Sequence, residues 1–409
     1  MKYKLGNLSN FYDSLHKTPK VYSTSGYPMI RVKDIETGFL NISQTANVSE
    51  VDYLEFTKKY KPTVGDIIIT RVGTYGNVAL VVKDENFCLG QNTVVLNPIR
   101  KTIDNKYLFY ALRDPYVQQQ IESKVTGSTQ KTISLKSLKE IEVKRFDYKK
   151  EILIGKFLYN IDNKIEINKK IIANLEELSQ TLFKRWFVDF EFPDEDGNPY
   201  KSSGGEMVDS ELGEIPKNWS IKIVKEIAES FNSIRKPLSK LEREKRESIY
   251  PYYGATKIID YVDNYIFDGK YILVGEDGTV QTETGNPFIQ YVWGKFWVSN
   301  HAHILKGKLI SDELLMLYLK NTNVVPYITG AVQPKLNKKN LNSIKFVIAD
   351  KETIIKFENF IKSYFQKIRI LNKENKKLIE LRDTLLPKLM SGELEIPDDV
   401  EVNTDELSI

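Results

Sequence analysis

The chain has 409 residues, of which 41% are hydrophobic and 28% charged, and a formal net charge of +4. This composition is typical of a globular protein, and no apolar run approaches the ~18 to 20 residues that a membrane span needs. The start of the chain shows no signal peptide, so we expect a cytoplasmic protein with two domains of ordinary size. A single cysteine, Cys88, excludes an intramolecular disulfide and a cysteine-rich zinc site.

Acidic residues gather at the end of the chain, so the rest is more basic than the total charge indicates. They are Glu393, Glu395, Asp398, Asp399, Glu401, Asp405 and Glu406. A basic body favours a polyanionic partner, although a moderately basic surface is also typical of any soluble protein.

The first globular domain is predicted over residues 1–147. Apolar runs between glycine turns predict strands at residues 65–73, 78–82 and 91–98. Residues 106–121 have the apolar spacing of a helix. A small polar loop at residues 126–131 and a short apolar stretch lead into the next segment.

A long helix is predicted over residues 148–191, most clearly between Lys149 and Phe187. Two neighbouring lines at heptad spacing form the seam of a coiled coil. The first line is Ile154, Ile161, Asn168, Leu175 and Leu182, and the second is Leu158, Ile165, Ile172, Ser179 and Trp186. At ~1.5 Å per residue this helix would be on the order of 58 Å long, which suits a spacer between two bodies.

The rest of the chain repeats this plan. Residues 192–211 are rich in Pro, Gly, Ser and Asp and are predicted to be a linker. A second globular domain is expected over residues 212–350, a C-terminal helix over 351–393 and an acidic tail over 394–409.

The repeat is visible in the residues themselves. Thr126-Gly127-Ser128-Thr129-Gln130 aligns with Thr329-Gly330-Ala331-Val332-Gln333, and this offset of 203 residues continues without a gap along the helix. The second seam is then Phe357, Tyr364, Leu371, Leu378 and Leu385 beside Ile361, Ile368, Asn375, Arg382 and Leu389. A repeat of about half the chain indicates two copies of a domain with a long helix, because a solenoid needs a much shorter period.

We expect the two long helices to pack against each other in antiparallel orientation. Asn168 would then face Asn375, and Ile172 and Leu175 would face Leu371 and Ile368 respectively. A buried Asn pair penalises slipped registers, because a slip places each amide against hydrocarbon. The alternative is that the two Asn residues are separately solvated at imperfect seam positions. The predicted fold is thus α+β: two mixed α/β domains separated by two long antiparallel coiled-coil helices, with a pseudo-twofold internal repeat.

Motifs for catalysis are missing from the chain. There is no phosphate loop ending in Gly-Lys-Ser/Thr and no Asn/Asp-Pro-Pro-Tyr/Phe loop of an amino-methyltransferase. His301 and His303 have no third metal ligand nearby, so we expect polar groups on a binding surface or a hydrogen-bonded core pair. We therefore predict no catalytic residue, no metal site and no cofactor in this chain.

Both domains carry glycine turns flanked by polar side chains that suit nucleic acid. Amides of Gln and Asn can read adenine, Arg and Lys can read guanine, and backbone N–H groups can hold phosphate. The candidate DNA contacts are Arg71, Tyr75, Asn77, Gln91, Asn92, Ser128, Thr129, Gln130, Lys131, Tyr253, Lys257, Gln281, Asn300, His301, Gln333 and Lys335. The charged run at residues 235–246 is predicted to be either an exposed helix or a face that follows phosphates.

The order of these parts resembles the specificity subunit of type I DNA restriction-modification enzymes. The resemblance covers essentially the whole chain. It rests on the repeat and on three flanking motifs: Leu-Phe-Lys-Arg-Trp-Phe-Val-Asp-Phe at 182–190, Leu-Gly-Glu-Ile-Pro-Lys-Asn-Trp at 212–219, and Leu-Leu-Pro-Lys-Leu-Met-Ser-Gly-Glu-Leu at 385–394. The first domain lacks the Leu-Gly-Glu-Ile-Pro opening, which leaves the anchoring of its N-terminus open.

This resemblance implies two target-recognition domains that each read one half of a split double-stranded DNA site. It also implies that the helices dock two methyltransferase subunits, and that a full enzyme adds two restriction subunits. S-adenosylmethionine would belong to the methyltransferase partner, which methylates adenine, and ATP and Mg to the restriction partner. Two other readings are an orphan DNA-binding subunit without a nuclease partner and a two-headed protein scaffold.

Overall fold

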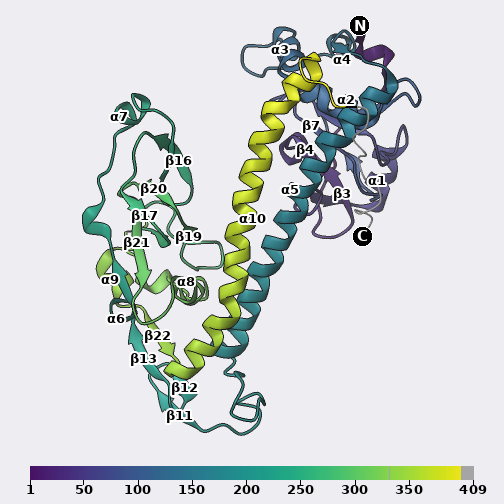
Figure 1. The fold of residues 1–409 in the computed structure, drawn as a ribbon. Coiled ribbons are helices and arrows are strands. Elements are labelled where there is room, and N and C mark those ends of the chain that lie inside the picture. The colour runs from purple at the N-terminus through teal and green to yellow at the C-terminus, as the bar shows by residue number, and fades with distance from the viewer. Residues whose placement is uncertain (331, 398–409) are drawn as a thin grey trace. The chain divides into compact units, whose positions relative to one another are not determined.

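The computed structural model describes residues 1–330 and 332–397, so the predicted acidic tail from residue 398 onward lies outside the described residues (Figure 1). The chain forms two compact units. The first contains residues 1–169 and the chain from Asn372 onward, and the second contains Lys170–Leu371. Each unit holds one head and one half of each long helix. Among the described residues, no helix has the length and apolar character that crossing a bilayer requires.

The first head is built on a five-stranded sheet in the order β2-β9-β6-β7-β4. These strands are Ser9–Asp13, Thr93–Pro98, Ile67–Thr70, Val78–Leu80 and Gly38–Phe39. Neighbours are antiparallel except β4 and β7. A smaller sheet orders β5 (Ala46–Val48), β3 (Tyr27–Ile30) and β8 (Cys88–Leu89). All four residues of β6 are buried, so the predicted strand at 65–73 is the centre of the sheet.

The second head repeats this order as β14-β21-β18-β19. The strands are Ala228–Ser230, Ala302–Gly307, Tyr271–Gly275 and Ile289–Val292. Its second sheet repeats the order and pairing of β5-β3-β8, with one antiparallel and one parallel neighbour of the middle strand, and adds a fourth strand. It runs β16-β15-β20-β17, over Ile258–Val262, Tyr250–Tyr253, Lys295–Val298 and Phe267–Asp268. The two heads therefore share the strand order of both sheets and differ in the edge strands, β4 in the first head and β17 in the second, and the mixed α/β content predicted for each is confirmed.

Short strand pairs close each head at its junction with a long helix. In the first head β1 (Lys2–Lys4) pairs antiparallel with β10 (Glu142–Lys144), and in the second β13 (Ser220–Ile223) pairs with β22 (Lys345–Ile348). In the second head the Leu-Gly-Glu-Ile-Pro segment, residues 212–216, precedes β13. The remaining short helices are α1 (Glu50–Thr57), α4 (Leu135–Lys139), α6 (Val224–Ile227), α7 (Lys240–Glu244) and α9 (Lys338–Asn342).

The helix predicted at residues 106–121 is two helices. The first is α2 (Asn105–Arg113) and the second is α3 (Pro115–Ser123), with Asp114 between them in an extended conformation. Pro115 is the cause, because the residue before a proline is driven out of the helical region. The counterpart of α2 in the second head is α8 (Asp312–Lys320), of which all but the last residue are buried.

The two long helices are α5 (Tyr148–Phe183) and α10 (Lys351–Ser391). A π-helical turn, Lys184–Val188, extends α5, so the helix predicted between Lys149 and Phe187 is confirmed and its last turn is wider than expected. Gly155 is the glycine of this helix for a packing reason. A Cβ there would lie 2.6 Å from the backbone nitrogen of Tyr107, so α5 and the first turn of α2 approach too closely for any side chain.

The predicted heptad lines lie on the buried side of both long helices. On α5, residues of both lines are buried in the first unit, including Ile154, Leu158 and Ile165. In the second unit, Ile172 and Leu175 pack against the hydrophobic cluster that contains Ile368. Within each unit α5 and α10 run side by side (Figure 1).

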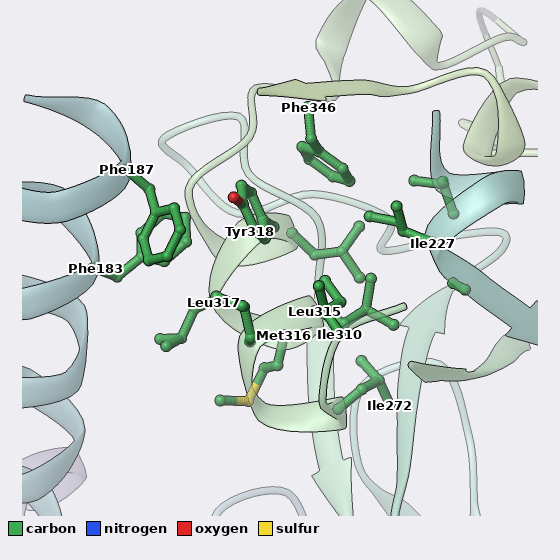
Figure 2. Close-up of a cluster of buried hydrophobic side chains, with 14 of the residues drawn as sticks. Phe183, Phe187, Ile227, Ile272, Ile310, Leu315, Met316, Leu317, Tyr318 and Phe346 are labelled. Atoms are coloured by element: carbon green, nitrogen blue, oxygen red, sulfur yellow. The ribbon is translucent and has the colours of Figure 1, made fainter. Parts of the chain in front are cut away.

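The end of α5 belongs to the core of the second head. Phe183 and Phe187 point toward Tyr318 of α8, and their rings lie 4.9 and 5.5 Å from the tyrosine ring (Figure 2). Trp186 contacts Phe357 of α10 with ring centres 5.4 Å apart. The aromatic motif at the end of the first long helix therefore joins α5, α8 and α10.

The segment predicted to be a linker is more structured than its composition indicates. Phe192 is buried and stacks on Trp219 at 4.8 Å. Strand β11 (Met207–Ser210) pairs with β12 (Gly213–Pro216) in an antiparallel hairpin. Composition did not predict this structure, because buried aromatic side chains order a Gly- and Pro-rich segment that has no periodic residue pattern.

Candidate DNA-recognition surface and helix seam

In the first head the structure places the polar loop at 126–132 next to the turn that follows β6. Thr126 and Thr132 exchange two backbone hydrogen bonds of 2.9 and 2.8 Å, and Gly73 donates to the carbonyl of Lys131 at 3.3 Å. Tyr75 and Lys131 meet here, because the ammonium lies 3.5 Å from the phenol oxygen and also pairs with Glu122. Ser128, Thr129 and Gln130 are exposed on the same loop. The structure therefore brings the candidates Tyr75, Ser128, Thr129, Gln130 and Lys131 together.

Arg71 lies beneath that loop and is largely buried. Its guanidinium donates to both carboxylate oxygens of Asp13, at 3.0 and 2.9 Å, and to the carbonyl of Ile133 at 3.1 Å. The side chain therefore fastens the end of the loop to the sheet, and a DNA contact by Arg71 stays a prediction.

The other candidates of the first head are tied to the backbone around β6. The amide of Asn77 donates to the carbonyl of Ile35 at 3.0 Å. Asn92 has a left-handed backbone with φ of 65°, and its carbonyl accepts from the backbone of Arg71. Gln91 precedes it and is half-buried. These three positions shape the turns, and their reading of bases is untested.

In the second head a matching loop lies beside the turn after β18. Thr329 and Lys335 exchange two backbone hydrogen bonds of 2.9 and 2.8 Å, and Gly278 donates to the carbonyl of Pro334 at 3.1 Å. Gln333 and Lys335 are exposed on this loop. His301 joins the same surface, with Nδ1 2.5 Å from a carboxylate oxygen of Asp277, and Asn300 precedes it.

Three further candidates lie elsewhere in the second head. Tyr253 belongs to β15, and its ring packs edge-on against Phe296. Lys257 is exposed in the turn between β15 and β16, and Gln281 is exposed beside Pro287. No contact joins these three to the loop of Gln333 in the described part of the chain.

The structure places His301 and His303 in different environments. His303 is fully buried on β21, where Nε2 donates to the carbonyl of Leu336 at 2.6 Å, so Nδ1 accepts from the amide of Asn232 at 2.7 Å. Burial lowers the pKa of His303, which keeps the ring neutral in this network. His301 is exposed and does not share the position of His303. In the described ranges, no group of three or more His, Cys, Asp or Glu side chains could hold a metal.

Sequence reasoning did not assign Arg235 or Glu276 to the site. Arg235 donates to Glu276 at 2.7 Å and to the carbonyl of Ala302 at 2.7 Å, beneath the loop that carries Lys335. In the sequence, nothing distinguishes Arg235 from the other charged residues of the run at 235–246. That run is in part the exposed helix α7, and Arg243 and Arg246 are held by Asp260 and Asp263 at 2.8 Å.

The helix seam in the first unit contains the predicted Asn pair. The amide nitrogen of Asn168 donates to the side-chain oxygen of Asn375 at 2.9 Å and to Glu374 at 3.0 Å, and both Asn side chains are buried. Thus the prediction that Asn168 faces Asn375 is confirmed, and the alternative of two separately solvated amides is wrong.

Asp162 of α5 forms an ionic cluster one and a half turns away from the Asn pair. Arg113 of α2 and Arg382 of α10 each lie 2.6 Å from its carboxylate, and Tyr110 donates to it at 2.8 Å. Burial works to raise the pKa of Asp162, but the two arginines outweigh it and hold that pKa below its ordinary value. Since Asp162 meets Arg382 and Asn168 meets Asn375, the two helices run antiparallel in this unit.

In the second unit an ion pair also joins the head to a long helix, but here the acidic residue belongs to the head and the basic residue to α10. Glu313 of α8 lies 3.0 Å from Arg369 of α10 and 2.7 Å from Lys270. Tyr291 donates to the same carboxylate at 2.7 Å. Burial works to raise the pKa of Glu313, but the contacts with Lys270 and Tyr291 outweigh it and lower that pKa. The acid therefore comes from the long helix in the first unit and from the head in the second.

Comparisons with known proteins agree with this geometry. A family model described as type I restriction modification DNA specificity domain matches residues 2–177 and 216–380. The type I restriction enzyme MjaIX specificity subunit of Methanocaldococcus jannaschii is 25% identical over 93% of this chain and 89% of its own length. A putative specificity subunit of Haemophilus influenzae, S.HindORF215P, is 38% identical over 31% of this chain and 32% of its own length.

A solved structure shows a similar fold. The S subunit of a type I restriction-modification system from M. genitalium superposes with a TM-score of 0.59 at 21% identity, over 95% of each chain. At this identity the likeness concerns the fold alone.

Proposed function

The chain belongs to the type I restriction-modification specificity family, and we propose that its two heads each read one half of a bipartite, asymmetric DNA site. As a member of that family it provides DNA-sequence specificity within a complex. The observation that carries the two-headed reading is the repeated pair of sheets, β2-β9-β6-β7 with β5-β3-β8 and β14-β21-β18-β19 with β16-β15-β20, under sequences that differ between the heads. A shared scaffold with different surfaces is what two half-sites of different sequence require.

The proposed arrangement is two target-recognition domains with a pseudo-twofold repeat, separated by an antiparallel coiled coil. The coil acts as a ruler whose length and register set the unread spacer between half-sites. The antiparallel contacts in each unit support this, because Asp162 meets Arg382 in the first and Trp186 meets Phe357 in the second.

We propose that partner subunits carry out catalysis. We propose that the long helices dock two methyltransferase subunits that bring S-adenosylmethionine and methylate adenine at N6. Two restriction subunits with ATP and Mg would complete an ATP-dependent endonuclease. The lack of a nucleotide phosphate loop and of a methyltransferase loop in the sequence supports this division of labour. A cytoplasmic location of this complex remains a prediction.

The proposal is tested by the affinity of the chain for duplex DNA in complex with a methyltransferase encoded beside it. The probe is a pool of random-sequence duplexes of about three helical turns, bound at several salt concentrations. A reader loses affinity steeply as salt rises and enriches a split motif from the pool. A protein scaffold would assemble with its partner, show no salt-dependent duplex affinity and enrich nothing, which would overturn the proposal.

A further inference from the structure

One loop occurs in nearly the same form in both heads, although the heads differ around it. We define the duplicated loop as residues 126–132 in the first head and the described residues 329–330 and 332–335 in the second. Both are closed at their ends by the same pair of backbone hydrogen bonds, described above. Gly127 and Gly330 turn the chain at the same point, with φ of 98° and 88°, and a Cβ at either would collide with the carbonyl oxygen three residues ahead, that of Gln130 or Gln333. The loop is therefore a defined hairpin in each head.

Different side chains hold this loop in the same place. The backbone is held alike in both heads: the N–H of Ile133 donates to the backbone carbonyl of Arg71 at 3.0 Å, and that of Leu336 to the backbone carbonyl of Glu276 at 2.9 Å. The carbonyl of Ile133 accepts from the Arg71 guanidinium, whereas that of Leu336 accepts from the ring of His303. Two unlike anchors for one position indicate that the position of the loop matters in both heads.

The residues that follow the loop are also equivalent. Ser134 caps the N-terminus of α4 by accepting from Ser137 at 2.9 Å, and Asn337 caps α9 by accepting from Asn340 at 2.9 Å. Two residues after the cap, each short helix carries a lysine at the same offset, Lys136 in α4 and Lys339 in α9. Loop and lysine therefore form one repeated unit.

This unit presents hydrogen-bond donors that the chain itself leaves unused. Gln130 and Gln333 are exposed, and neither side chain forms a hydrogen bond within the described residues. Lys136 and Lys339 are exposed as well, and neither forms a salt bridge with any residue that the structure describes. In the first loop, the backbone N–H groups of Ser128, Thr129 and Gln130 have no acceptor among residues 1–330 and 332–397. Amide, ammonium and backbone donors together suit an anion.

We infer that the duplicated loop and its lysine bind the sugar-phosphate backbone of each half-site regardless of base sequence. This inference rests on the proposed function. Two half-sites of different sequence share their phosphates, so a surface that is the same in both heads fits the shared feature. The diverged surfaces then read bases, while this unit sets the depth and angle at which each head meets the duplex. The exposed tip of the first loop is polar, at Ser128, Thr129 and Gln130, whereas the second loop also exposes one apolar side chain, Val332.

The test removes the shared donors from one head at a time in the full complex with the methyltransferase. One variant combines Gln130→Ala with Lys136→Ala, and the other combines Gln333→Ala with Lys339→Ala. Affinity is measured for a duplex with the methylated motif and for a duplex with both half-sites scrambled. We expect both affinities to fall by the same factor, on the order of tenfold, and the salt slope to decrease by about one. The methylated motif should not change.

A matched control removes the same two residue types from another exposed part of the first head. Gln119→Ala with Lys101→Ala deletes one amide and one charge, and both side chains are exposed. This variant should bind both duplexes as the unaltered chain does. Gln130→Glu, which keeps the size of the side chain, should weaken both affinities because a carboxylate repels phosphate.

Three outcomes would overturn the inference. A loss confined to the motif duplex, or an altered motif, would make the loop a base reader. Loss of the methyltransferase from the complex at unchanged DNA affinity would make it a protein-docking surface. Unchanged affinity in both variants would leave the loop without a role in DNA binding. If the unaltered complex itself shows no salt-sensitive duplex affinity, the proposed function fails and this inference fails with it.

Discussion

At the scale of the residue, Asp162 shows how one carboxylate joins three helices. It lies on α5 and receives Arg113 and Tyr110 from α2 and Arg382 from α10. A buried pair of this kind contributes little net stability compared with apolar packing, but removal of one partner leaves buried charge without compensation. Asp162 therefore specifies how the head and the two long helices meet within the first unit.

Replacement of Asp162 by Asn should lower the free energy of unfolding by about 3 to 5 kcal/mol, because two buried arginines lose their counter-charge. Urea unfolding near neutral pH measures this. Asp383 is the matched control, since it also contacts Arg382 but its side chain is 59% exposed. Asp383→Asn should change the free energy of unfolding by less than about 1 kcal/mol. Equal effects of the two substitutions would contradict the assignment.

The same carboxylate gives a pH dependence of known sign. The folded-state pKa of Asp162 is lowered, whereas an unfolded Asp titrates near ~3.9. Its stabilising contribution is thus fully present above that pH and is lost as the pH falls through the lowered pKa. The stability difference between the unaltered chain and Asp162→Asn should therefore shrink as the pH drops below about 4. A difference that grows on acidification would refute this reading.

At the scale of the element, the long helices combine an apolar seam with one buried amide pair. Asn168 and Asn375 bond to each other at 2.9 Å, and Glu374 accepts from the same amide. Apolar residues around them tolerate a shift by one heptad, because Leu and Ile replace each other in such seams at small cost. The Asn168–Asn375 pair does not tolerate such a shift, so this pair specifies the register of the two helices.

Replacement of both Asn168 and Asn375 by Leu should raise the melting temperature and loosen the register. Cysteine pairs introduced at aligned positions and at positions shifted by one heptad, in a Cys88→Ser background, report the register by disulfide formation. The unaltered seam should cross-link only in the aligned pair, and the Leu variant in both. Asn168→Leu alone should be destabilising, because it strands the amide of Asn375. A double variant that melts lower and cross-links only in the aligned pair would argue against this role.

The sequence predicted the elements whose apolar residues recur at a regular spacing. It did not predict contacts that follow no regular spacing. The heptad lines and the 203-residue offset predicted α5, α10 and the facing of Asn168 and Asn375, because those depend on spacing alone. The burial of Arg235, the bonds of His303 and the partners of Asp162 depend on strands and helices that are distant in sequence. For the same reason the sequence did not show that Arg71, a predicted DNA contact, lies beneath the loop at 126–132 and bonds to Asp13 and Ile133.

At the scale of the whole molecule, the chain consists of two units, each with a head and half of each helix. Each head is fastened to the helical part of its own unit by charges, and the polarity is reversed between units: Asp162 on the helix in one and Glu313 on the head in the other. The heads are therefore distinguishable in their docking as well as in their surfaces.

Deletion of one heptad from α5 together with the matching heptad from α10 tests the ruler. Seven residues correspond to about 10 Å of helix, or about three base pairs of duplex. The spacer between half-sites should shorten by about that amount while both half-sites stay the same. Replacing one heptad in each helix by another of the same length, with the seam residues kept, is the control and should leave the spacer unchanged. An unchanged spacer in the deletion variant would exclude the ruler.

The central claim, that this chain reads a split DNA site for a methyltransferase, is tested most directly by a methylation map. The chain is co-expressed with the methyltransferase encoded beside it in a host that lacks other adenine methylation, and methylated adenines are mapped over the genome. The account predicts a single asymmetric motif of two half-sites around a fixed spacer, methylated on both strands. A stable complex that leaves the genome unmethylated, or one that methylates adenine without any split motif, would contradict it.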